Sequence, residues 1–279
     1  MNGFILVNKE SGVSSNRVVQ EIKRKIKADK VGHLGTLDPL ADGLLVLAVN
    51  RATKFSNYFL ESNKSYDVKV RLGISTDTDD STGKIISESD HIPSEEEVKD
   101  NLFNFIGDSM QIPPFFSALK YKGKPLYKYA RQGEFISKPP RKITISNINN
   151  FSYKNKICSF QLECSKGTYI RSIARDLGKN LGCGAHMKSL TRLSQAEFQL
   201  SEANNVSDIT KQNIIFIETA FKIFNKISIN LDESKKFING VKLPTKHNSD
   251  TLLRVFNEKD KFLGIGKIKD NKLKHKQLV

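Results

Sequence analysis

Alternating and continuous apolar residues predict several strands in the first half of the chain. The clearest strand is 66–72, where every second residue is apolar and the residues between them are charged. This alternation predicts a strand with one face against a core and the other in solvent. Unbroken apolar runs at 4–7 and 44–49 predict two buried strands.

Three segments have the spacing of amphipathic helices. The first follows Ser14 and Ser15, either of which is a suitable N-cap. The second begins with Ser94 and Glu97, the pattern of a capping box. The third follows Gly167 and ends before Gly182. The apolar positions expected to face a core are Val18, Val19, Ile22 and Ile26 in the first helix, Val98, Leu102 and Ile106 in the second, and Ile170, Ile173, Ala174, Leu177 and Leu181 in the third.

Residues 108–140 interrupt this regularity. Paired prolines bracket the segment, which is rich in Lys, Tyr and Phe and contains one short predicted helix at 126–131. Aromatic rings stack on bases and lysines bind phosphates, so this composition suits a long insertion that grips RNA. The pattern alone leaves an ordinary surface excursion open as the alternative.

The arrangement of the elements predicts the fold class. Two further strands, 143–153 and 157–165, flank a polar turn. Strands joined by hairpins and interrupted by helices favour an α+β fold with a mixed, largely antiparallel sheet flanked by helices and loops. Near the end, short strands separated by polar turns predict a small β-rich C-terminal domain. The expected domains are residues 1–225 and 226–279.

The charge balance narrows the choice of partner. The 279 residues include 45 Lys and Arg against 30 Asp and Glu, a formal net charge of +15. This excess suits a polyanion, either nucleic acid or an anionic membrane surface, although a Lys-rich composition inherited from an AT-rich genome is an alternative. The N-terminal apolar run is too short for a signal peptide, and no segment has the length of a membrane span. We therefore expect a cytoplasmic protein that does not insert into a membrane.

The cysteines favour neither a disulfide framework nor a metal site. Cys158, Cys164 and Cys183 are odd in number and form no CxxC pair, which is typical of a reduced compartment. Cys183 and His186 are close in sequence, but two ligands alone do not make a zinc site. We therefore expect no metal and no other cofactor.

Two segments combine residue types that carry chemistry. Segment 32–43, GHLGTLDPLADG, places glycines, a histidine and Asp38 between structured elements, where catalytic groups often lie. Taken alone, Asp38 followed by Pro39 also suits a simple turn. In segment 166–171, KGTYIR, the start of a helix can attract an anion. Here Arg171 is expected to point outward, as the partner of a carboxylate or as an ordinary surface arginine.

Four segments together carry a family resemblance. In order they are GHLGTLDPLADGLL, KSYDVKVRLGISTDTDDSTG, IPPFFSALKYKGKPLYKYARQG and CSKGTYIRSIARDLGKNLGCGAH, and they cover most of residues 4–200. The chain resembles the TruB-type tRNA pseudouridine synthases, a family that includes the bacterial tRNA pseudouridine-55 synthases. The match fades over 201–235, and the tail is similar to a shortened PUA-type RNA-binding domain.

The resemblance implies a pseudouridine synthase fold, an activity and a site. The implied activity converts the T-loop uridine at tRNA position 55 to pseudouridine after flipping the base out of its stack. Asp38 would be the nucleophile and Arg171 its ion-pair partner, while Tyr66 would stack on the uracil and take part in proton transfer. Attack on ribose C1′, attack on uracil C6 and removal of a ribose proton all stay open as routes for Asp38. The other substrate-binding residues that the resemblance implies are His33, Lys64, Tyr169 and Leu190.

The implied partner is the T arm of tRNA. The short tail favours a stand-alone monomer without an obligatory protein partner. One alternative is a non-catalytic RNA-binding or tRNA-folding protein on the same scaffold, and another is a synthase acting on a different structured RNA. The combination of Asp38, Tyr66 and Arg171 argues against the first, because phosphate binding alone has no use for a carboxylate in a basic cleft.

Overall fold

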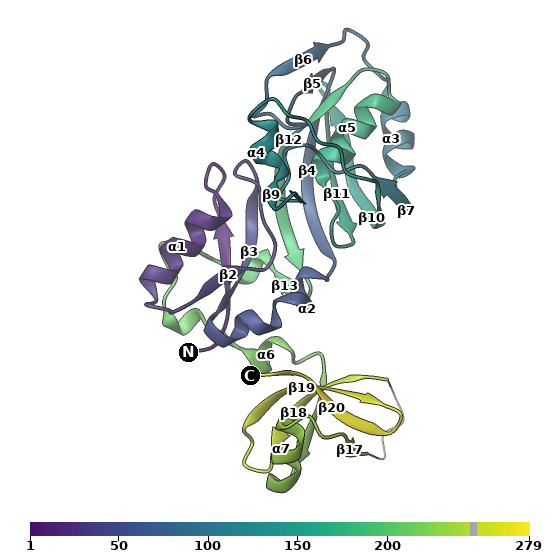
Figure 1. The fold of residues 1–279 in the computed structure, drawn as a ribbon. Helices are drawn as coiled ribbons and strands as arrows, with labels where there is room; N and C mark the ends of the chain where they lie inside the picture. Colours follow the sequence, from purple (N-terminus) through teal and green to yellow (C-terminus); the bar gives the residue numbers. More distant parts are fainter. Residues whose placement is uncertain (246–249) are drawn as a thin grey trace.

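The larger part of the molecule is built on an 11-stranded sheet (Figure 1). The structure, a computed structural model, describes residues 1–245 and 250–279. Neighbouring strands are antiparallel except at the first and third junctions of the main path, so the predicted mixed, largely antiparallel sheet is confirmed. In spatial order the main path is β14 (Asn204–Asn205), β1 (Gly3–Lys9), β3 (Asp42–Val49), β12 (Ala185–Gln195), β4 (Lys64–Leu72), β11 (Ile157–Cys164), β10 (Arg141–Lys154) and β7 (Gly107–Gln111), with β2 (Val31–His33), β13 (Phe198–Gln199) and β15 (Ile215–Phe216) pairing beside it.

Three helices bury their apolar faces in one large core against this sheet. They are α1 (Ser15–Lys25), α3 (Glu95–Phe103) and α5 (Ile170–Asn180). The opposite face of β1 and β3 packs in a second cluster with α2 (Ser56–Leu60) and α6 (Ile217–Ala220). None of the helices in residues 1–245 and 250–279 is long and apolar enough to cross a membrane.

The predicted helix starts are confirmed, with one error at a helix end. Ser14 caps α1 by accepting a hydrogen bond from the backbone of Arg17. The capping box of Ser94 and Glu97 is present at α3. The prediction that Ile106 belongs to the buried face of this helix is wrong, because the helix ends at Phe103 and Ile106 is 45% exposed.

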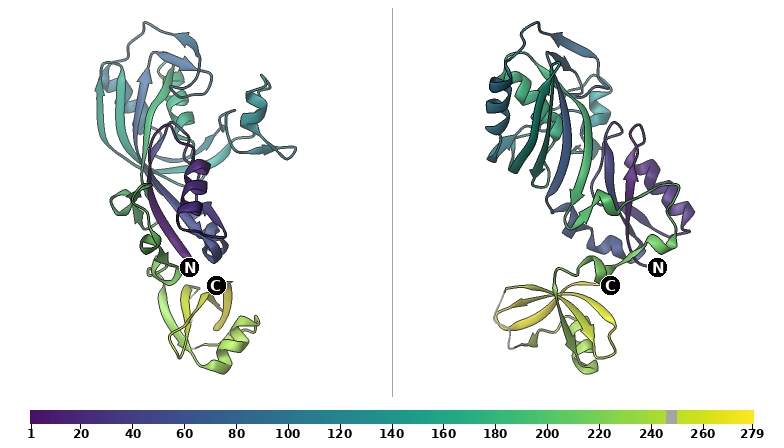
Figure 2. Two further views of the ribbon diagram at one scale, coloured as in Figure 1. Left: turned by 90° about the vertical axis from the view of Figure 1, so that its left-hand side faces the viewer. Right: turned by 180° about the vertical axis from the view of Figure 1, so that it is seen from behind.

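The predicted insertion is shorter than residues 108–140. Residues 107–111 form β7, which pairs with β10 as an edge strand of the sheet. Beyond it the chain forms the hairpin β8 (Lys120–Tyr121) and β9 (Lys124–Pro125), followed by the predicted short helix as α4 (Leu126–Ala130). The left view of Figure 2 shows this arm standing away from the sheet.

Sequence periodicity missed a central strand. The 11-residue strand β12 lies between β3 and β4, but its sequence lacks a clean apolar alternation. The reason is that His186, Arg192 and Gln195 are buried alongside its apolar residues. Such buried polar side chains cannot be told from solvent-facing ones in the sequence.

The C-terminal part forms a separate five-stranded sheet below the first (Figure 1). This agrees with the predicted small β-rich unit, but the helix α7 (Leu231–Ile238) was not predicted. Phe237 of this helix packs in the unit's own apolar cluster, whereas Ile265 joins the cluster around Phe4 of the main sheet. The strands are β16 (Asn225–Ile229), β18 (Leu252–Asn257), β19 (Phe262–Lys269), β20 (Lys272–Leu278) and β17 (Leu243–Pro244), in spatial order.

Candidate active site

The loop that carries Asp38 is shorter than the predicted segment 32–43. Residues 31–33 form β2 and Asp42 begins β3, so the loop proper covers residues 34–41. Its end is held close to β12 by Gly43, which has a φ of +93°. A Cβ at this position would lie 2.5 Å from the carbonyl oxygen of Arg192. A side chain here would therefore push β3 and β12 apart beneath the loop.

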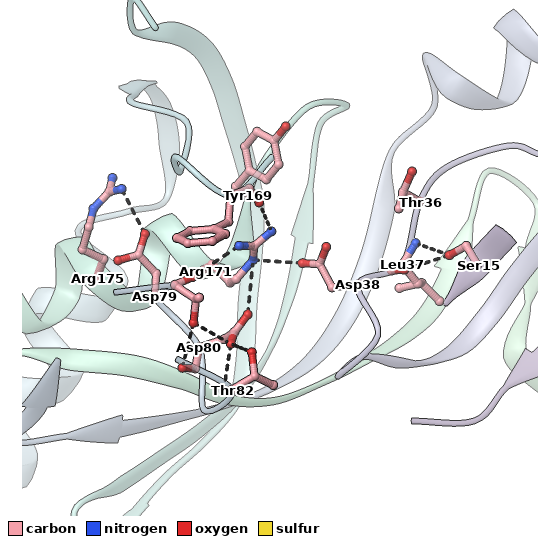
Figure 3. A network of polar contacts seen from close by, with 12 residues as sticks. Ser15, Thr36, Leu37, Asp38, Asp79, Asp80, Thr82, Tyr169, Arg171 and Arg175 are labelled. Atoms are coloured by element: carbon pink, nitrogen blue, oxygen red, sulfur yellow. Dashed lines mark hydrogen bonds and ion pairs between the residues drawn. The ribbon is translucent and has the colours of Figure 1, made fainter. Parts of the chain in front are cut away.

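Hydrogen bonds from α1 and β1 fix the residues on both sides of Asp38. The Ser15 hydroxyl donates to the carbonyl of Leu37 at 2.8 Å and accepts from its N–H at 2.9 Å (Figure 3). The ammonium of Lys9 donates to the carbonyl of Pro39 at 3.4 Å and to two further carbonyls. Asp38 is thus presented on a loop whose backbone has little freedom to shift.

Asp38 forms an ion pair with Arg171. Arg171 Nε lies 2.9 Å from Asp38 Oδ2, in a contact that is not aligned for a hydrogen bond. The expectation that Arg171 points outward is wrong, because only 6% of its side chain is exposed, against 35% for Asp38. The remaining nitrogens of Arg171 donate to the carbonyls of Thr78 and Phe116, at 3.3 and 3.0 Å. The cation is therefore held in place, and the carboxylate that it pairs with faces the open side.

A second carboxylate, Asp80, lies behind this pair and was not predicted. Its Oδ2 is 3.8 Å from Arg171 Nε (Figure 3). Its Oδ1 accepts hydrogen bonds from the backbone N–H and hydroxyl of Thr82 and from the hydroxyl of Thr78, at 2.6–2.9 Å. Two carboxylates thus share one buried guanidinium, and Asp38 is the more exposed of the two, at 35% against 7%.

A cleft of about 890 Å³ opens beside the ion pair. Its apolar wall includes Tyr66 and Leu190, which are 6% and 7% exposed and come from the adjacent strands β4 and β12. Every site residue predicted from the sequence lines this one cleft: His33, Asp38, Lys64, Tyr66, Tyr169, Arg171 and Leu190.

The cleft is basic at its rim and poorly solvated inside. Arg141 lies 4.5 Å from the ring centroid of Tyr169. Burial lowers the pKa of Lys64 to about 8, so this lysine is still mostly charged at neutral pH. Burial also lowers the pKa of His33 and raises that of Tyr66, which keeps both side chains neutral there. Such an interior suits an uncharged base, and the rim suits phosphates.

Cys183 and His186, the two residues considered as zinc ligands, each contact a backbone carbonyl instead. Cys183 Sγ contacts the carbonyl of Gly184 at 3.3 Å, and His186 Nδ1 lies 2.9 Å from the carbonyl of Ile74. No cluster of three or more His, Cys, Asp or Glu side chains in the described ranges is arranged to hold a metal ion.

Solved structures of distant sequence share the fold. A chain of a Cbf5–Nop10–Gar1 complex matches with a TM-score of 0.73 at 22% identity, over 99% of this chain and 84% of that one. A chain of an H/ACA RNP bound to a substrate RNA containing 2′-deoxyuridine matches with a TM-score of 0.72 at 20% identity, over 99% and 84%. The main sheet with its helices therefore has the pseudouridine synthase fold, and the small C-terminal unit follows it as a separate domain.

Family models assign the chain more narrowly. The model of the TruB family pseudouridylate synthase N-terminal domain matches residues 23–170. The tRNA pseudouridylate synthase B C-terminal domain matches residues 171–224, and the pseudouridine synthase II TruB C-terminal model matches residues 226–279. The chain therefore belongs to the TruB family of pseudouridine synthases.

Relatives that match this chain over nearly its full length carry the name of the same family. The chain is 38% identical to the tRNA pseudouridine synthase B of Clostridium kluyveri, with 98% of each chain covered. It is 40% identical to the protein of the same name from Francisella tularensis subsp. novicida, with 99% of this chain and 94% of that one covered.

Proposed function

We propose that this protein converts the uridine at position 55 in the T loop of tRNA to pseudouridine. The observation that carries the proposal is the placement of the Asp38–Arg171 ion pair beside the apolar wall formed by Tyr66 and Leu190. Full-length relatives named tRNA pseudouridine synthase B support tRNA as the substrate.

The cleft fits a base that has left its stack. A uridine inside a folded loop hides its glycosidic bond, so the enzyme must extrude the nucleotide and hold the base between apolar walls. In this proposal the ring of Tyr66 stacks on the uracil, with Leu190 on the wall of the same pocket. His33 lies in the same cleft, and burial lowers its pKa, so its ring is neutral. In this proposal it borders the extruded nucleotide.

The reaction exchanges one bond to the ribose for another within a single pocket. The C1′–N1 bond breaks, the C1′–C5 bond forms, C5 loses a proton and N1 gains one, so composition does not change. Asp38 supplies the nucleophilic carboxylate, and Tyr66 assists the transfer of the C5 proton. The base, held between the apolar walls of the pocket, keeps water from the intermediate.

Arg171 and Asp80 prepare Asp38 for this role. The guanidinium of Arg171, 2.9 Å away, pairs with the carboxylate and aims it. Asp80 lies 3.8 Å from the same Nε, so Arg171 keeps a counter-ion when Asp38 becomes bonded to substrate and loses its charge. Asp80 is therefore a positioning residue that acts through Arg171.

The direct experiment is incubation with an unmodified tRNA transcript, followed by mapping of pseudouridine at single-nucleotide resolution. We expect one modified site, at position 55. A transcript that is bound tightly but never modified would instead support the RNA-binding alternative, and modification only of another structured RNA would support the second alternative.

The C-terminal unit is proposed to contribute RNA affinity rather than catalytic groups. Lys272, Lys274 and Lys276 alternate with buried Leu273 along β20, so they present a row of exposed charges. Each phosphate neutralised by such a lysine adds to affinity.

Deletion of residues 225–279 is therefore expected to weaken tRNA binding by about tenfold or more, while the single-turnover rate at saturating RNA stays within about threefold. Filter binding and rapid-quench kinetics separate the two quantities. Thermal melting is the control, because the deletion also removes Ile265 from the cluster around Phe4. A large fall in the saturated rate of a folded deletion variant would contradict this division.

Lys64 predicts a pH dependence of binding. Its pKa of about 8 lies well below the ordinary value of a lysine, so its charge is present at neutral pH and lost as the pH rises through 8. If the charged form binds a phosphate, affinity should fall by about fivefold to tenfold between about pH 7 and pH 9. Lys64→Arg, which stays charged throughout, is the matched control and should flatten this part of the curve. An identical pH profile for both proteins would remove Lys64 from the phosphate contacts.

A further inference from the structure

Arg192 on β12 is a buried cation without a carboxylate partner. Only 2% of Arg192 is exposed. In the described part of the chain its guanidinium forms no ion pair. Its Nε has no hydrogen-bond partner there either. Burying a guanidinium without a counter-charge is costly, so the groups that accept its hydrogen bonds matter.

The guanidinium holds the loop that carries Asp38. Its Nη2 donates to the carbonyl of Thr36 at 2.8 Å, and its Nη1 donates to the carbonyl of Gly35 at 3.2 Å and of Leu44 at 3.3 Å. These carbonyls lie on both sides of Asp38 along the chain. A planar fork of donors is suited to bind several carbonyls at once in one fixed arrangement.

The same guanidinium lies against Tyr66. Its central carbon is 5.7 Å from the centroid of the tyrosine ring, and the two residues face each other in the register of β12 and β4. Arg192 thus contacts the loop of the proposed nucleophile on one side and the proposed stacking residue on the other.

The charge of Arg192 also acts on the cleft. Burial is the main cause of the lowered pKa of His33 and of Lys64, and the positive charge of Arg192 is the second cause. Around Tyr66, burial is the main cause of the raised pKa. Arg192 from β12 opposes that rise, whereas Cys164 from β11 and Asp38 from the loop add to it. Lys64, two residues before Tyr66 on β4, lines the same cleft, as do the cations Arg131, Arg141 and Arg171.

We propose that Arg192 is a positioning residue for the isomerisation, which ties the Asp38 loop to Tyr66 so that the two side chains keep one relative placement at the base. The inference rests on the proposed function and deepens it, because it names a residue of the cleft lining that acts through Asp38 and Tyr66. It also explains why a cation is buried in a strand at the centre of the sheet.

Two substitutions test the fork. Arg192→Lys keeps a positive charge but cannot bind three carbonyls in a plane, and Arg192→Met keeps the apolar stem alone. We expect both to lower the single-turnover rate at saturating tRNA transcript by about 30-fold or more, because small misplacements of reacting groups are costly. The dissociation constant for tRNA should stay within about threefold, since the guanidinium is buried.

His186→Met is the matched control for a merely structural role. His186 lies on the same strand and is 8% exposed, and its Nδ1 lies 2.9 Å from the carbonyl of Ile74, away from the Asp38 loop and outside the residues that line the cleft. We expect this variant to lower the melting temperature at least as much as Arg192→Lys, with a saturated rate reduced by less than about fivefold.

Chemical rescue of the reaction rate gives a second readout, which does not depend on how well Arg192→Met folds. Arg192→Ala leaves a cavity of the right shape, and millimolar guanidinium chloride should restore its saturated rate by about fivefold or more. Sodium chloride at the same concentration should not.

The outcomes are distinct. Near-normal saturated rates in both the Lys and Met variants of Arg192 would overturn its role. So would a rate loss that follows melting temperature alike in the His186 and Arg192 variants, or a loss confined to tRNA affinity. An unsubstituted protein that forms no pseudouridine in tRNA would overturn the proposed function itself, and this inference with it.

Discussion

Asp38→Asn is expected to lower the rate of pseudouridine formation by about 10⁴-fold or more, while tRNA affinity stays within a few-fold. The amide nearly matches the carboxylate in shape, but it is a far weaker nucleophile and carries no charge for Arg171. The measurement is a single-turnover assay with excess enzyme on an unmodified tRNA transcript, alongside a binding titration.

The variant should still fold, which makes the result interpretable. The Asp38 side chain is 35% exposed, and Arg171 keeps Asp80 as a counter-ion when Asp38 is neutralised. Asp42→Asn is the matched control, because it makes the same change at the other end of this loop, outside the residues that line the cleft. Substantial turnover by purified Asp38→Asn would sink the assignment of the nucleophile, as would an equal loss in Asp42→Asn.

Tyr66→Phe is expected to lower the saturated rate by more than about a hundredfold, with tRNA affinity and melting temperature nearly unchanged. The substitution keeps the ring that stacks on the base and removes only the hydroxyl that assists proton transfer. Tyr66→Leu should lose the same step and also bind the base less well, since stacking contributes about 1–3 kcal/mol per base.

Two other results would each assign Tyr66 a different role. Near-normal turnover of Tyr66→Phe would reduce Tyr66 to a stacking surface and move proton transfer elsewhere. An unstable Tyr66→Phe would make it a core residue, in keeping with its place on the buried face of β4 beside Val68 and Val70. Tyr58→Phe is the control, because Tyr58 lies outside the cleft and its hydroxyl has no hydrogen-bond partner in the described structure.

Local patterns in the sequence were sufficient for the strands β1, β3, β4, β10 and β11 and for the helices α1, α3, α4 and α5. The alternation in β4 and the caps of α1 and α3 predict what the structure contains, because they depend on neighbours only a few residues away. The same patterns failed at Ile106, where the helix ended a turn early, and at residues 107–111, where pairing with β10 made a strand of an expected loop.

The residue types of the candidate site were also visible in the sequence, but the sequence alone did not distinguish a catalytic role from an ordinary structural one. Asp38 by itself suited a turn, and Arg171 suited the surface. Only a resemblance of whole segments singled them out, together with the other residues that line the cleft.

The tertiary structure decided which charges meet. Arg171 is buried because the Asp38 loop, Asp80 and the base of the arm converge on the start of α5 from distant parts of the chain. Arg192 holds the Asp38 loop because β3 and β12 run side by side. A charged residue looks alike in sequence whether it faces water or an interior partner. Its free energy of burial depends on long-range pairing, so the sequence by itself determined the local elements and the chemical groups, and the fold determined which of these groups act together.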